Sequence, residues 1–482
     1  MENSIFRFTN CLLDIDSLRL FEGLKSSIVV DNSSFSGSLS DSLILLSSSS
    51  LLVDNSLFTY LNTSNLVYSS FTSIEFSHSS IMEVTANSVF HLDQSDIVLS
   101  DLNITSVSSK EFVCGNLSTI FLSLIEIDQS ISNVWFSLIN CIFHLNNLNF
   151  SSTHGDAFSV VNSTDFFLSM VLVVNPNLSV FLNALNSELS IYLLSLFNCT
   201  GSILEHSVNS SITTHNLTVT DSLFDTLFLL SDSSLSLSLG NIGSSSFNNS
   251  TLVLYNSTLE VEEVTIDLVS TSILLESMES TSTFENVIIR NYDFLQFLVL
   301  TRSKASFYSL SMDRCQLFEL DYSIYDIILI ESFITLEKSY LSGCVSNEQF
   351  KLSLYSEQSF LHLLAFDQEF FFSSIVLDHS NITIMSHVSV ISKSVSIDEE
   401  SIILGNAPLL DLSFLISNIS ISPSQHCCNT SICQVSLNFN NIGYISELLE
   451  LAVPNNDEFY HNFLLNSLDF FFNRHYYFQS NE

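Results

Sequence analysis

The sequence predicts an all-β protein, a single-stranded parallel β-helix in which the chain winds into a solenoid of stacked rungs. Three observations support this fold class: a repeat of about 23 residues, three short apolar stretches in each repeat, and a composition rich in Ser, Asn, Leu, Ile, Val and Phe. A fixed period in this range is the sequence signature of a repeat architecture. It predicts how the chain is built, but it names no reaction.

Each repeat opens with a Ser-x-apolar-x-apolar element, in which Thr or Cys sometimes replaces the serine. Successive starts lie 22 to 24 residues apart, at Ser26, Ser49, Thr72, Ser95, Ser118, Cys141, Ser163, Ser187, Ser210, Ser233, Ser257, Ser280 and Ser303. The period therefore covers more than half of the chain without interruption, which favours one elongated repeat array over several globular domains.

Three strands and three corners are expected in each repeat. Positions three and five are apolar and alternate with polar residues, which is the period of a strand with one buried face. The next apolar pair falls at positions eight and ten, so the chain must bend between the two pairs to keep both inside. A third apolar stretch follows near position seventeen. The tenth position should point inward in every rung, as in Phe35, Phe58, Ile81, Ile104 and Ile127.

Three positions break the apolar columns. Asp165 and Ser282 occupy the third position, and Thr214 occupies the fifth. A solenoid tolerates such local faults because each rung contacts only its neighbours.

Two other repeat architectures fit less well. Helical repeats need Ala, Lys, Arg and Gln for their surfaces, and this chain has few of them. A leucine-rich repeat has a suitable length, but its single strand per repeat and its fixed asparagine frame do not recur here.

The repeat divides the chain into three parts. Residues 1–25 are expected to form an N-terminal cap or a truncated first rung, and residues 26–453 the β-helix, regular to about residue 303. Later starts at Ser332, Ser359 and Ser380 leave uneven gaps of 29, 27 and 21 residues, with extra residues at 321–330 and 347–351 that are either binding loops or tolerated drift. The aromatic-rich residues 454–482 are expected to form a C-terminal cap or tail.

The charge of the chain restricts its partners. Twelve Lys and Arg stand against 51 Asp and Glu, which gives a formal net charge of −39. Such a surface repels nucleic acids, anionic lipids and acidic polysaccharides. No apolar run reaches the roughly 18 residues of a membrane helix, so no membrane span is predicted. The expected partners are a carbohydrate or a cell-surface protein.

Cysteines suggest two cross-links and no metal site. Cys315 and Cys344 each lie 12 residues after a start, so a disulfide between stacked rungs is predicted. A local disulfide between Cys427 and Cys433, or free thiols at these positions, is the second prediction. A zinc site made by the cluster of His426, Cys427, Cys428 and Cys433 is the alternative, although its spacing matches no standard knuckle. Cys11, Cys114, Cys141 and Cys199 fit as buried small residues.

No catalytic, cofactor-binding or metal-binding residue is predicted, and no cofactor. Nucleophile elbows, phosphate-binding loops, dinucleotide fingerprints and zinc-protease motifs are all absent from the sequence. His154-Gly155-Asp156 is the one compact His/Asp element, expected at a corner. Asp367 and Glu369 have the spacing of two acids on one strand face, as in a glycosidase pair, although a solvated face explains them better. Glu260, Glu262 and Glu263, like Asp398, Glu399 and Glu400, fit no calcium-binding frame.

Rungs such as Ser257-Thr-Leu-Glu-Val-Glu-Glu-Val-Thr-Ile266 resemble those of the pectin-lyase-like superfamily of parallel β-helix proteins. More loosely, Phe143-His-Leu-Asn146 and Phe463-Leu-Leu-Asn466 are similar to a motif of polymorphic outer-membrane-protein repeats, whose companion Gly-Gly-Ala-Ile motif is missing. The resemblance implies a right-handed helix and, from the non-enzymatic members, surface display and adhesion. The catalytic residue sets of the pectinolytic members are not found, so their activity is not implied.

Two functions remain open at this point. The first is a non-catalytic cell-surface or secreted scaffold for adhesion or structural display, in an extracellular location. Numerous Asn-x-Ser/Thr sequons, among them Asn32, Asn198 and Asn209, favour this location and a glycoprotein only slightly. The alternative is a carbohydrate-active enzyme, a polysaccharide lyase or glycoside hydrolase, with a site on the flank of the β-helix.

Overall fold

The computed structural model confirms an all-β solenoid with turns of about 23 residues, and the residues it describes contain no helix. It describes residues 4–313 except 18–19, 40 and 292. Beyond these it describes residues 316–317, 327–337, 340–341, 352–364, 368–384, 388–392, 395–397, 402–405, 409–411, 434–435 and 478–479. The chain divides into two compact units, residues 1–259 and 260–482. Each unit is described by itself.

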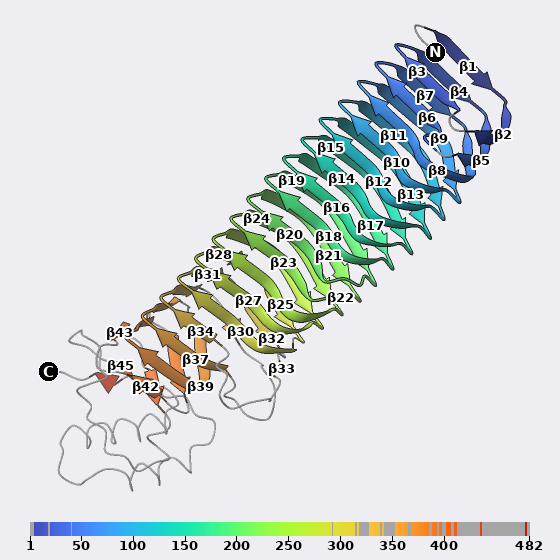
Figure 1. The fold of residues 1–482 in the computed structure, drawn as a ribbon. Helices are drawn as coiled ribbons and strands as arrows, with labels where there is room; N and C mark the ends of the chain where they lie inside the picture. Colours follow the sequence, from blue (N-terminus) through green and yellow to red (C-terminus); the bar gives the residue numbers. More distant parts are fainter. Residues whose placement is uncertain are drawn as a thin grey trace, which may run out of the picture. The chain divides into compact units, whose positions relative to one another are not determined.

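The first rungs of unit 1 have three separate strands, as the repeat predicts. These strands are β1 (Ile5–Thr9), β2 (Leu12–Ser17), β3 (Phe21–Leu24), β4 (Ser27–Asp31), β5 (Ser34–Leu39), β6 (Ile44–Ser47) and β7 (Ser50–Asp54). Each strand pairs in parallel with its equivalent one rung later: β1 with β4, β2 with β5 and β3 with β6. The chain therefore starts to wind at its first described strand (Figure 1).

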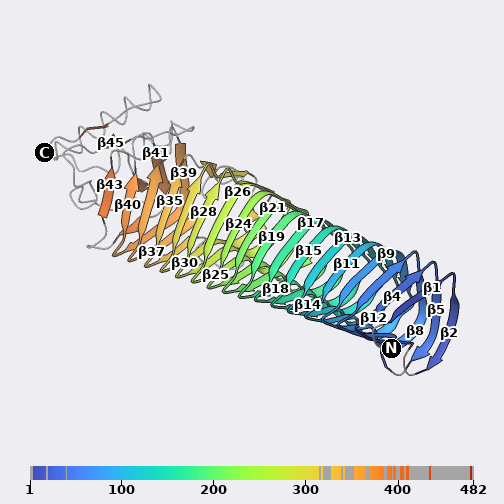
Figure 2. The same cartoon turned by 90° about the horizontal axis from the view of Figure 1, so that it is seen from above.

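Further along unit 1 the first two strands of each rung merge into one. The merged strands are β9 (Ser73–Met82), β11 (Asp96–Thr105), β13 (Thr119–Asp128), β15 (Ile142–Ser151), β17 (Asp165–Val174), β19 (Glu188–Phe197), β21 (Ser211–Thr220) and β24 (Ser234–Gly243). β8 (Leu57–Ser70) spans the second and third faces of its rung. The third faces of later rungs hold β10 (Thr85–Asp93), β12 (Ser108–Asn116), β14 (Ile131–Ile139), β16 (His154–Asn162), β18 (Asn177–Leu185), β20 (Ile203–Val208), β22 (Leu223–Phe224), β23 (Thr226–Ser231) and β25 (Ser246–Tyr255). Figure 2 shows the merged strands side by side along this unit.

The corners are made by single residues in the left-handed region of the backbone. In the rung that starts at Ser118 they are Leu117 (φ 51°), Leu124 (φ 52°) and Gln129 (φ 48°), one for each corner. Leu124 lies inside β13, so the merged strand bends there and both of its halves keep an inward face. Because Asn tolerates this conformation better than other non-glycine residues, many corners carry Asn, as at Asn140, Asn186 and Asn209.

The inward columns stack on themselves, as predicted. Phe35, Phe58, Ile81, Ile104 and Ile127 are all fully buried. The parallel register pairs Ile97 with Ile120 and Leu99 with Leu122, one rung apart. Ring contacts continue along the interior, with Phe35 and Phe58 stacked at 5.1 Å between centroids and Phe143 and Phe166 at 4.7 Å. Burial of these columns supplies the main driving force for stacking.

One predicted start is wrong by a residue. The rung after Cys141 starts at Thr164 instead of Ser163, because Thr164 Oγ1 accepts the hydrogen bond from the Cys141 N–H. The inward residues are therefore Phe166 and Leu168, which pair with Phe143 and Leu145. Asp165 is no fault in the third column, since it points outward.

The two remaining faults are real and are buried. Thr214 lies in the fifth column between Ile191 and Leu237, and its hydroxyl has no hydrogen-bond partner. The Ser282 hydroxyl reaches the carbonyl oxygen of Lys304 at 3.5 Å. Each fault is confined to its rung, as a solenoid allows.

Unit 2 keeps the winding through rungs of unequal length. β26 (Thr258–Asp267) contains the boundary between the units. The other strands are β27 (Ser270–Met278), β28 (Thr281–Glu285), β29 (Ile288–Arg290), β30 (Asp293–Thr301), β31 (Lys304–Tyr308), β32 (Ser311–Asp313), β33 (Gln316–Leu317), β34 (Ile327–Ile330), β35 (Phe333–Glu337), β36 (Tyr340–Leu341), β37 (Leu352–Glu357), β38 (Phe360–Leu364), β39 (Gln368–Asp378), β40 (Asn381–Ile384), β41 (Val388–Ser392), β42 (Val395–Ile397), β43 (Ile402–Gly405) and β44 (Leu409–Asp411), with β45 (Gln434–Val435) antiparallel to β46 (Phe478–Gln479).

The uneven rungs of unit 2 meet at the same corner. The N–H of Ser303 donates to the Ser332 hydroxyl at 3.0 Å, Ser332 to Ser359 at 2.8 Å, and Ser359 to Ser380 at 3.0 Å. The starts predicted at Ser332, Ser359 and Ser380 are thereby confirmed.

Candidate functional site

The first corner of the described rungs is held by a ladder of buried hydroxyl groups, in which the Cys141 thiol replaces the hydroxyl once. The N–H of Ser187 donates to the Ser210 hydroxyl at 3.1 Å, and the N–H of Ser210 donates to the Ser233 hydroxyl at 3.1 Å. Each hydroxyl also donates to the carbonyl oxygen two residues before it, as Ser187 does to Leu185 at 2.8 Å. Since these buried groups are paired, the corner is fixed in place, and so are the outward residues on either side of the ladder.

A shallow hollow of about 650 Å³ lies over this ladder in unit 1. Its lining comes from three places in each rung: the left-handed residue before the ladder, the ladder residue, and the first strand residue after it. The residues are Ser163, Thr164, Asp165, Asn186, Ser187, Glu188, Asn209, Ser210, Ser211, Asp232, Ser233, Ser234, Asn256 and Thr258. The same three positions of successive rungs therefore build one continuous polar surface.

Side-chain amides are connected along the hollow from rung to rung. Asn209 Nδ2 donates to Asn186 Oδ1 at 2.6 Å, and Asn256 Nδ2 donates to Asp232 Oδ1 at 2.6 Å. Neighbouring parallel strands lie about 4.8 Å apart, so polar groups are presented at that interval. The contacts between the amides reduce the number of conformations they sample before a ligand arrives.

The hollow is acidic. Asp165, Glu188 and Asp232 contribute carboxylates, and none of the lining residues is Lys, Arg or His. Asp165 and Glu188 are directly paired on β17 and β19, where like charges repel each other across the strands. This arrangement offers hydrogen-bond acceptors and a negative field, which suit hydroxyl-rich or cationic ligands and disfavour anionic ones.

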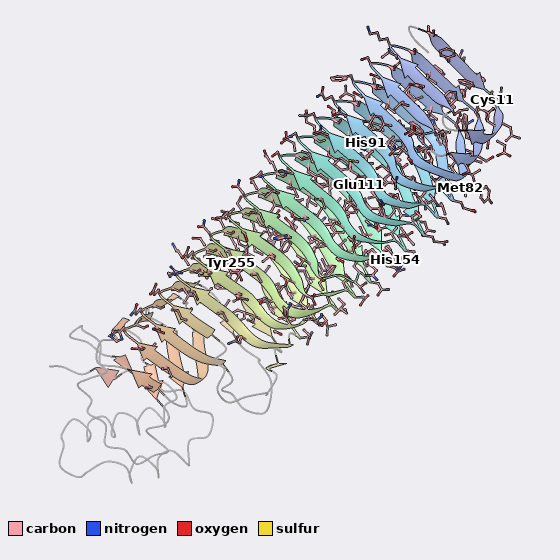
Figure 3. All side chains as sticks on the ribbon, in the orientation of Figure 1. Cys11, Met82, His91, Glu111, His154 and Tyr255 are labelled. Atoms are coloured by element: carbon pink, nitrogen blue, oxygen red, sulfur yellow. The ribbon has the colours of Figure 1, made fainter. Side chains whose placement is uncertain are left out.

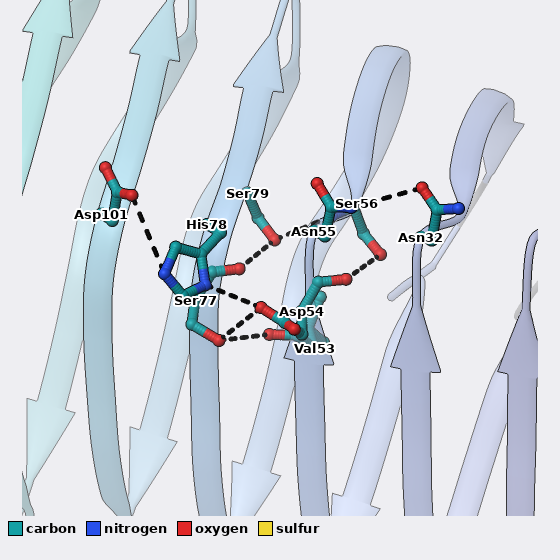
Figure 4. A network of polar contacts seen from close by, with 9 residues as sticks. All are labelled: Asn32, Val53, Asp54, Asn55, Ser56, Ser77, His78, Ser79 and Asp101. Carbon is teal, nitrogen blue, oxygen red and sulfur yellow. Dashed lines mark hydrogen bonds and ion pairs between the residues drawn. The ribbon is translucent and has the colours of Figure 1, made fainter.

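A second polar cluster lies on the surface at the second corner (Figure 4). His78 Nδ1 lies 2.9 Å from Asp54 Oδ1, and its Nε2 lies 4.0 Å from Asp101 Oδ2. The hydrogen bond with Asp54 raises the pKa of His78, and the bonds from His78 and Ser77 lower the pKa of Asp54. All three charged side chains are well exposed, so the cluster joins neighbouring rungs and forms no enclosed site.

One acid is buried in the interior below the hollow. Glu205 on β20 is paired in register with Leu182 and Phe228, and burial raises its pKa to about 7. The Ser207 hydroxyl donates to Glu205 Oε1 at 3.1 Å and partly offsets that rise. The group is enclosed by the solenoid and does not reach the hollow surface, so its effect is on folding stability.

The described cysteines behave as structural residues. Cys141 and Cys199 are buried at corner positions that elsewhere carry serine, and their N–H groups bond to Thr164 and Ser222. Cys11 and Cys114 are half-buried. Burial raises the pKa of both Cys199 and Cys114 to about 12, which disfavours the reactive thiolate.

Most sequence-based candidates lie outside the described residues. The structure describes neither Cys315 nor Cys344, neither Cys427 nor Cys433, and neither the Asp367 side chain nor that of Glu369. The disulfides and the acid pair therefore stay predictions. Among the described residues, no group of three His, Cys, Asp or Glu side chains could hold a metal ion.

His154-Gly155-Asp156 is described, and it forms no catalytic pair. His154 is exposed at the outer edge of the stacked strands (Figure 3), at the start of β16 just after a corner. A side chain at Gly155 would collide with the carbonyl oxygen of Ser132 one rung earlier. The glycine is therefore explained by the close approach of two backbones within the strand, not by a turn.

The hollow was not predicted from the sequence, although a signal for it exists. Reading the residue before each ladder position down the repeat gives Asn186, Asn209, Asp232 and Asn256 in succession. The buried Glu205 was also missed. It stands in a column that holds Phe136, Leu182 and Phe228 in other rungs. An alignment of the third strands of successive repeats would have shown an acid at an apolar position.

The corners also explain the sequons. Asn32, Asn198, Asn209 and Asn256 are left-handed corner residues, each followed by a small buried residue and then by a Ser or Thr that pairs with a neighbouring rung. The corner geometry favours this triplet, so these sequons provide no independent sign of secretion or glycosylation.

No model of a known protein family matches the chain, and no curated protein has a significantly similar sequence. In the described part of the chain, no helix is long and apolar enough to cross a membrane.

Proposed function

We propose that the chain is a non-catalytic scaffold that binds a ligand on its flank, acting in adhesion or structural display at the cell surface or outside the cell. The observation that carries this proposal is the hollow over the first-corner ladder, in which polar groups from successive rungs form one fixed surface. A resemblance to the pectin-lyase-like superfamily supports the same function, because its non-enzymatic members are display proteins.

The chemistry of the hollow favours a neutral, hydroxyl-rich chain such as an uncharged oligosaccharide. Amides donate and accept hydrogen bonds, carboxylates accept them, and the spacing of about 4.8 Å places a new set of groups at each rung. The negative field of Asp165, Glu188 and Asp232 opposes uronic acids and sulfated sugars.

Calorimetric titration with neutral, cationic and uronic-acid oligosaccharides tests the proposal. The neutral set is expected to bind, and the N186A/N209A variant to lose affinity by roughly thirtyfold, since two hydrogen bonds of about 1 kcal/mol each are affected. Asn55→Ala is the matched control, because Asn55 is also an exposed left-handed corner residue with an amide contact, to Asn32, but lies outside the hollow. Equal affinity in the wild type and N186A/N209A, or binding of uronic acids alone, would contradict the proposal.

A carbohydrate-active enzyme is the second candidate, and one observation favours it. Asp165 and Glu188 stand side by side in the hollow on neighbouring strands, with backbones about 4.8 Å apart. Two carboxyl groups at roughly 5 Å are the arrangement of a retaining glycosidase. Release of reducing ends by the wild type, and its loss in D165N and in E188Q, would favour this candidate over the scaffold.

A further inference from the structure

An apolar stripe crosses the flank of unit 1 beside the hollow. It consists of Phe121, Leu124, Ile142, Phe167, Met170 and Leu172, which are all exposed. The stripe lies on β13, β15 and β17, three neighbouring strands in parallel register. Between them, β15 places His144, Asn147 and Asn149 in the columns of Phe121, Leu124 and Leu172, so the stripe gathers apolar side chains over three rungs with polar residues among them. Exposed apolar side chains gathered in this way are typical of an interaction site, whereas single exposed apolar residues are common on any protein.

The fold does not require apolar residues in these places. Phe121, His144 and Phe167 share a column with Thr213 and Ser236 in later rungs, which stack equally well. The corner held by Leu124 and Met170 is held by Asn216 in the rung that starts at Ser210. Since polar residues satisfy the same backbone, the stripe is not explained by rung geometry.

The two aromatic side chains of the stripe, Phe121 and Phe167, are held by stacking on His144. The Phe121 and His144 rings are stacked at 5.0 Å between centroids with 11° between their planes, and the His144 and Phe167 rings lie at 5.5 Å and 43°. The rings cover each other's faces, so their edges face outward. A surface that is already ordered loses little conformational entropy on binding, and aromatic and methionine side chains are enriched where protein partners bind.

The charges around the stripe are negative. Asp165 pairs in register with Ile142. Asp101 occupies the same corner as Leu124, one rung earlier. Glu126 lies in the same column as Leu172, two rungs earlier. Between residues 95 and 187 the only Lys or Arg is Lys110, which lies on the third-face strand β12. A second copy of this chain, with its formal net charge of −39, would be repelled, and so would an anionic membrane.

We propose that the apolar stripe is the docking site for a protein segment that carries basic side chains between apolar ones. The apolar side chains cover the edges of Phe121 and Phe167, and the basic ones pair with Asp101, Glu126 and Asp165. This partner differs from the ligand of the hollow, so the stripe and the hollow can be tested separately.

Fluorescence anisotropy with three labelled peptides tests the docking site. The probes are a peptide of alternating Lys and Leu, the same peptide with Glu for Lys, and the same peptide with Ser for Leu. The Lys-Leu peptide is expected to bind the wild type at least tenfold more tightly than the F121S/F167S variant, and more weakly at high salt. The Glu-Leu peptide is expected not to bind, and the Lys-Ser peptide to bind both proteins equally weakly.

A control variant and a folding measurement show whether a loss of peptide binding is due to the stripe. Leu52→Ser is the matched control, because Leu52 is exposed in the same column as Phe121 but outside the stripe, and it should leave affinity unchanged. Circular dichroism should show that F121S/F167S remains folded. The proposal is overturned if the Lys-Leu peptide binds wild type and F121S/F167S equally. It is also overturned if sedimentation shows a stripe-dependent dimer, or if the stripe binds zwitterionic vesicles and none of the peptides.

Discussion

The stripe and the hollow lie next to each other on one flank of unit 1, and both have a negative charge, but their outward side chains differ in polarity. The stripe, on β13, β15 and β17, is aromatic and apolar, whereas the hollow, from Ser163 to Thr258, is made of amides, hydroxyls and carboxylates. They meet on β17, where Asp165 lines the hollow and Phe167 belongs to the stripe two residues later. Both rest on the same corner ladder and the same inward columns.

This difference separates what the fold needs from what it leaves free. Inward positions and ladder positions hardly change between the two regions, because each is constrained by the rungs before and after it. Outward positions change completely without affecting the winding. We therefore expect the residues that determine binding to be outward-facing ones.

The largest expected effect comes from breaking the ladder that both regions share. Deletion of residues 187–209, one whole rung, joins Asn186 to Ser210 and keeps every column in register. The protein should stay folded with a shorter hollow and an intact stripe. Deletion of residues 187–197 shifts the columns that follow and should abolish cooperative unfolding. Circular dichroism and thermal melting measure both. Equal damage from the two deletions would show that stacking does not depend on neighbours alone.

The interior below the hollow gives the next effect in size. The pKa of Glu205 is raised to about 7 in the folded chain from an ordinary value near 4.5, so the folded state binds the proton more tightly. Stability from this group is therefore present at low pH, falls as the pH rises through this window, and stays constant above it. The loss is on the order of 3 kcal/mol.

Chemical denaturation of Glu205→Gln between pH 4 and pH 8 measures this loss. The variant should lack this fall in the free energy of unfolding, so it should exceed the wild type most clearly at pH 8. Glu188→Gln is the control, because Glu188 belongs to the same rung but is exposed. Parallel pH curves for the wild type and Glu205→Gln would mean that Glu205 is accessible to water.

The sequence predicts the inward columns well because they repeat with a strict period. The error at Ser163 has a physical cause. Ser163 and Thr164 both have a hydroxyl that could hold the corner. Because Phe166, Phe167 and Leu168 are all apolar, the alternation of polar and apolar residues does not show which of them point inward. The decisive signal is the left-handed residue that must precede the ladder, and Ser163 is that residue.

The surfaces were less predictable because they depend on which outward residues become neighbours. Phe121 and Phe167 lie 46 residues apart in the sequence, and they form one stripe only after Ser163 is assigned correctly, since the wrong start points Phe167 inward. Asn186 and Asn209 likewise look like ordinary corner residues until the rungs are stacked.

Aromatic residues can be added to the polar region in the column that holds Phe121 and Phe167. T213F/S236F places two aromatic residues in the stripe column over β21 and β24, where the side chains face outward. We expect roughly tenfold tighter binding of the Lys-Leu peptide to the F121S/F167S protein when these two changes are added, because aromatic anchors contribute most of such binding energy. S27F is the control, because Ser27 is the first strand residue after a ladder position and lies outside the stripe, so peptide binding should not change. No gain in anisotropy would show that Leu124, Met170 and Leu172 are needed as well.

The smallest expected change in stability comes from Thr214, a polar residue in an otherwise apolar inward column. Thr214 lies in the fifth inward column, where Leu145, Leu168 and Ile191 precede it, and its buried hydroxyl has no partner. Thr214→Val keeps the shape of the side chain and removes the unpaired group, so it should stabilise unit 1 by about 1 kcal/mol. Thr213→Val, one residue away on the outward face, should change stability by less than about 0.5 kcal/mol. Urea denaturation compares the two. Destabilisation by Thr214→Val would mean that a bound water pairs with the hydroxyl, and that this buried polar group contributes to the stability of unit 1.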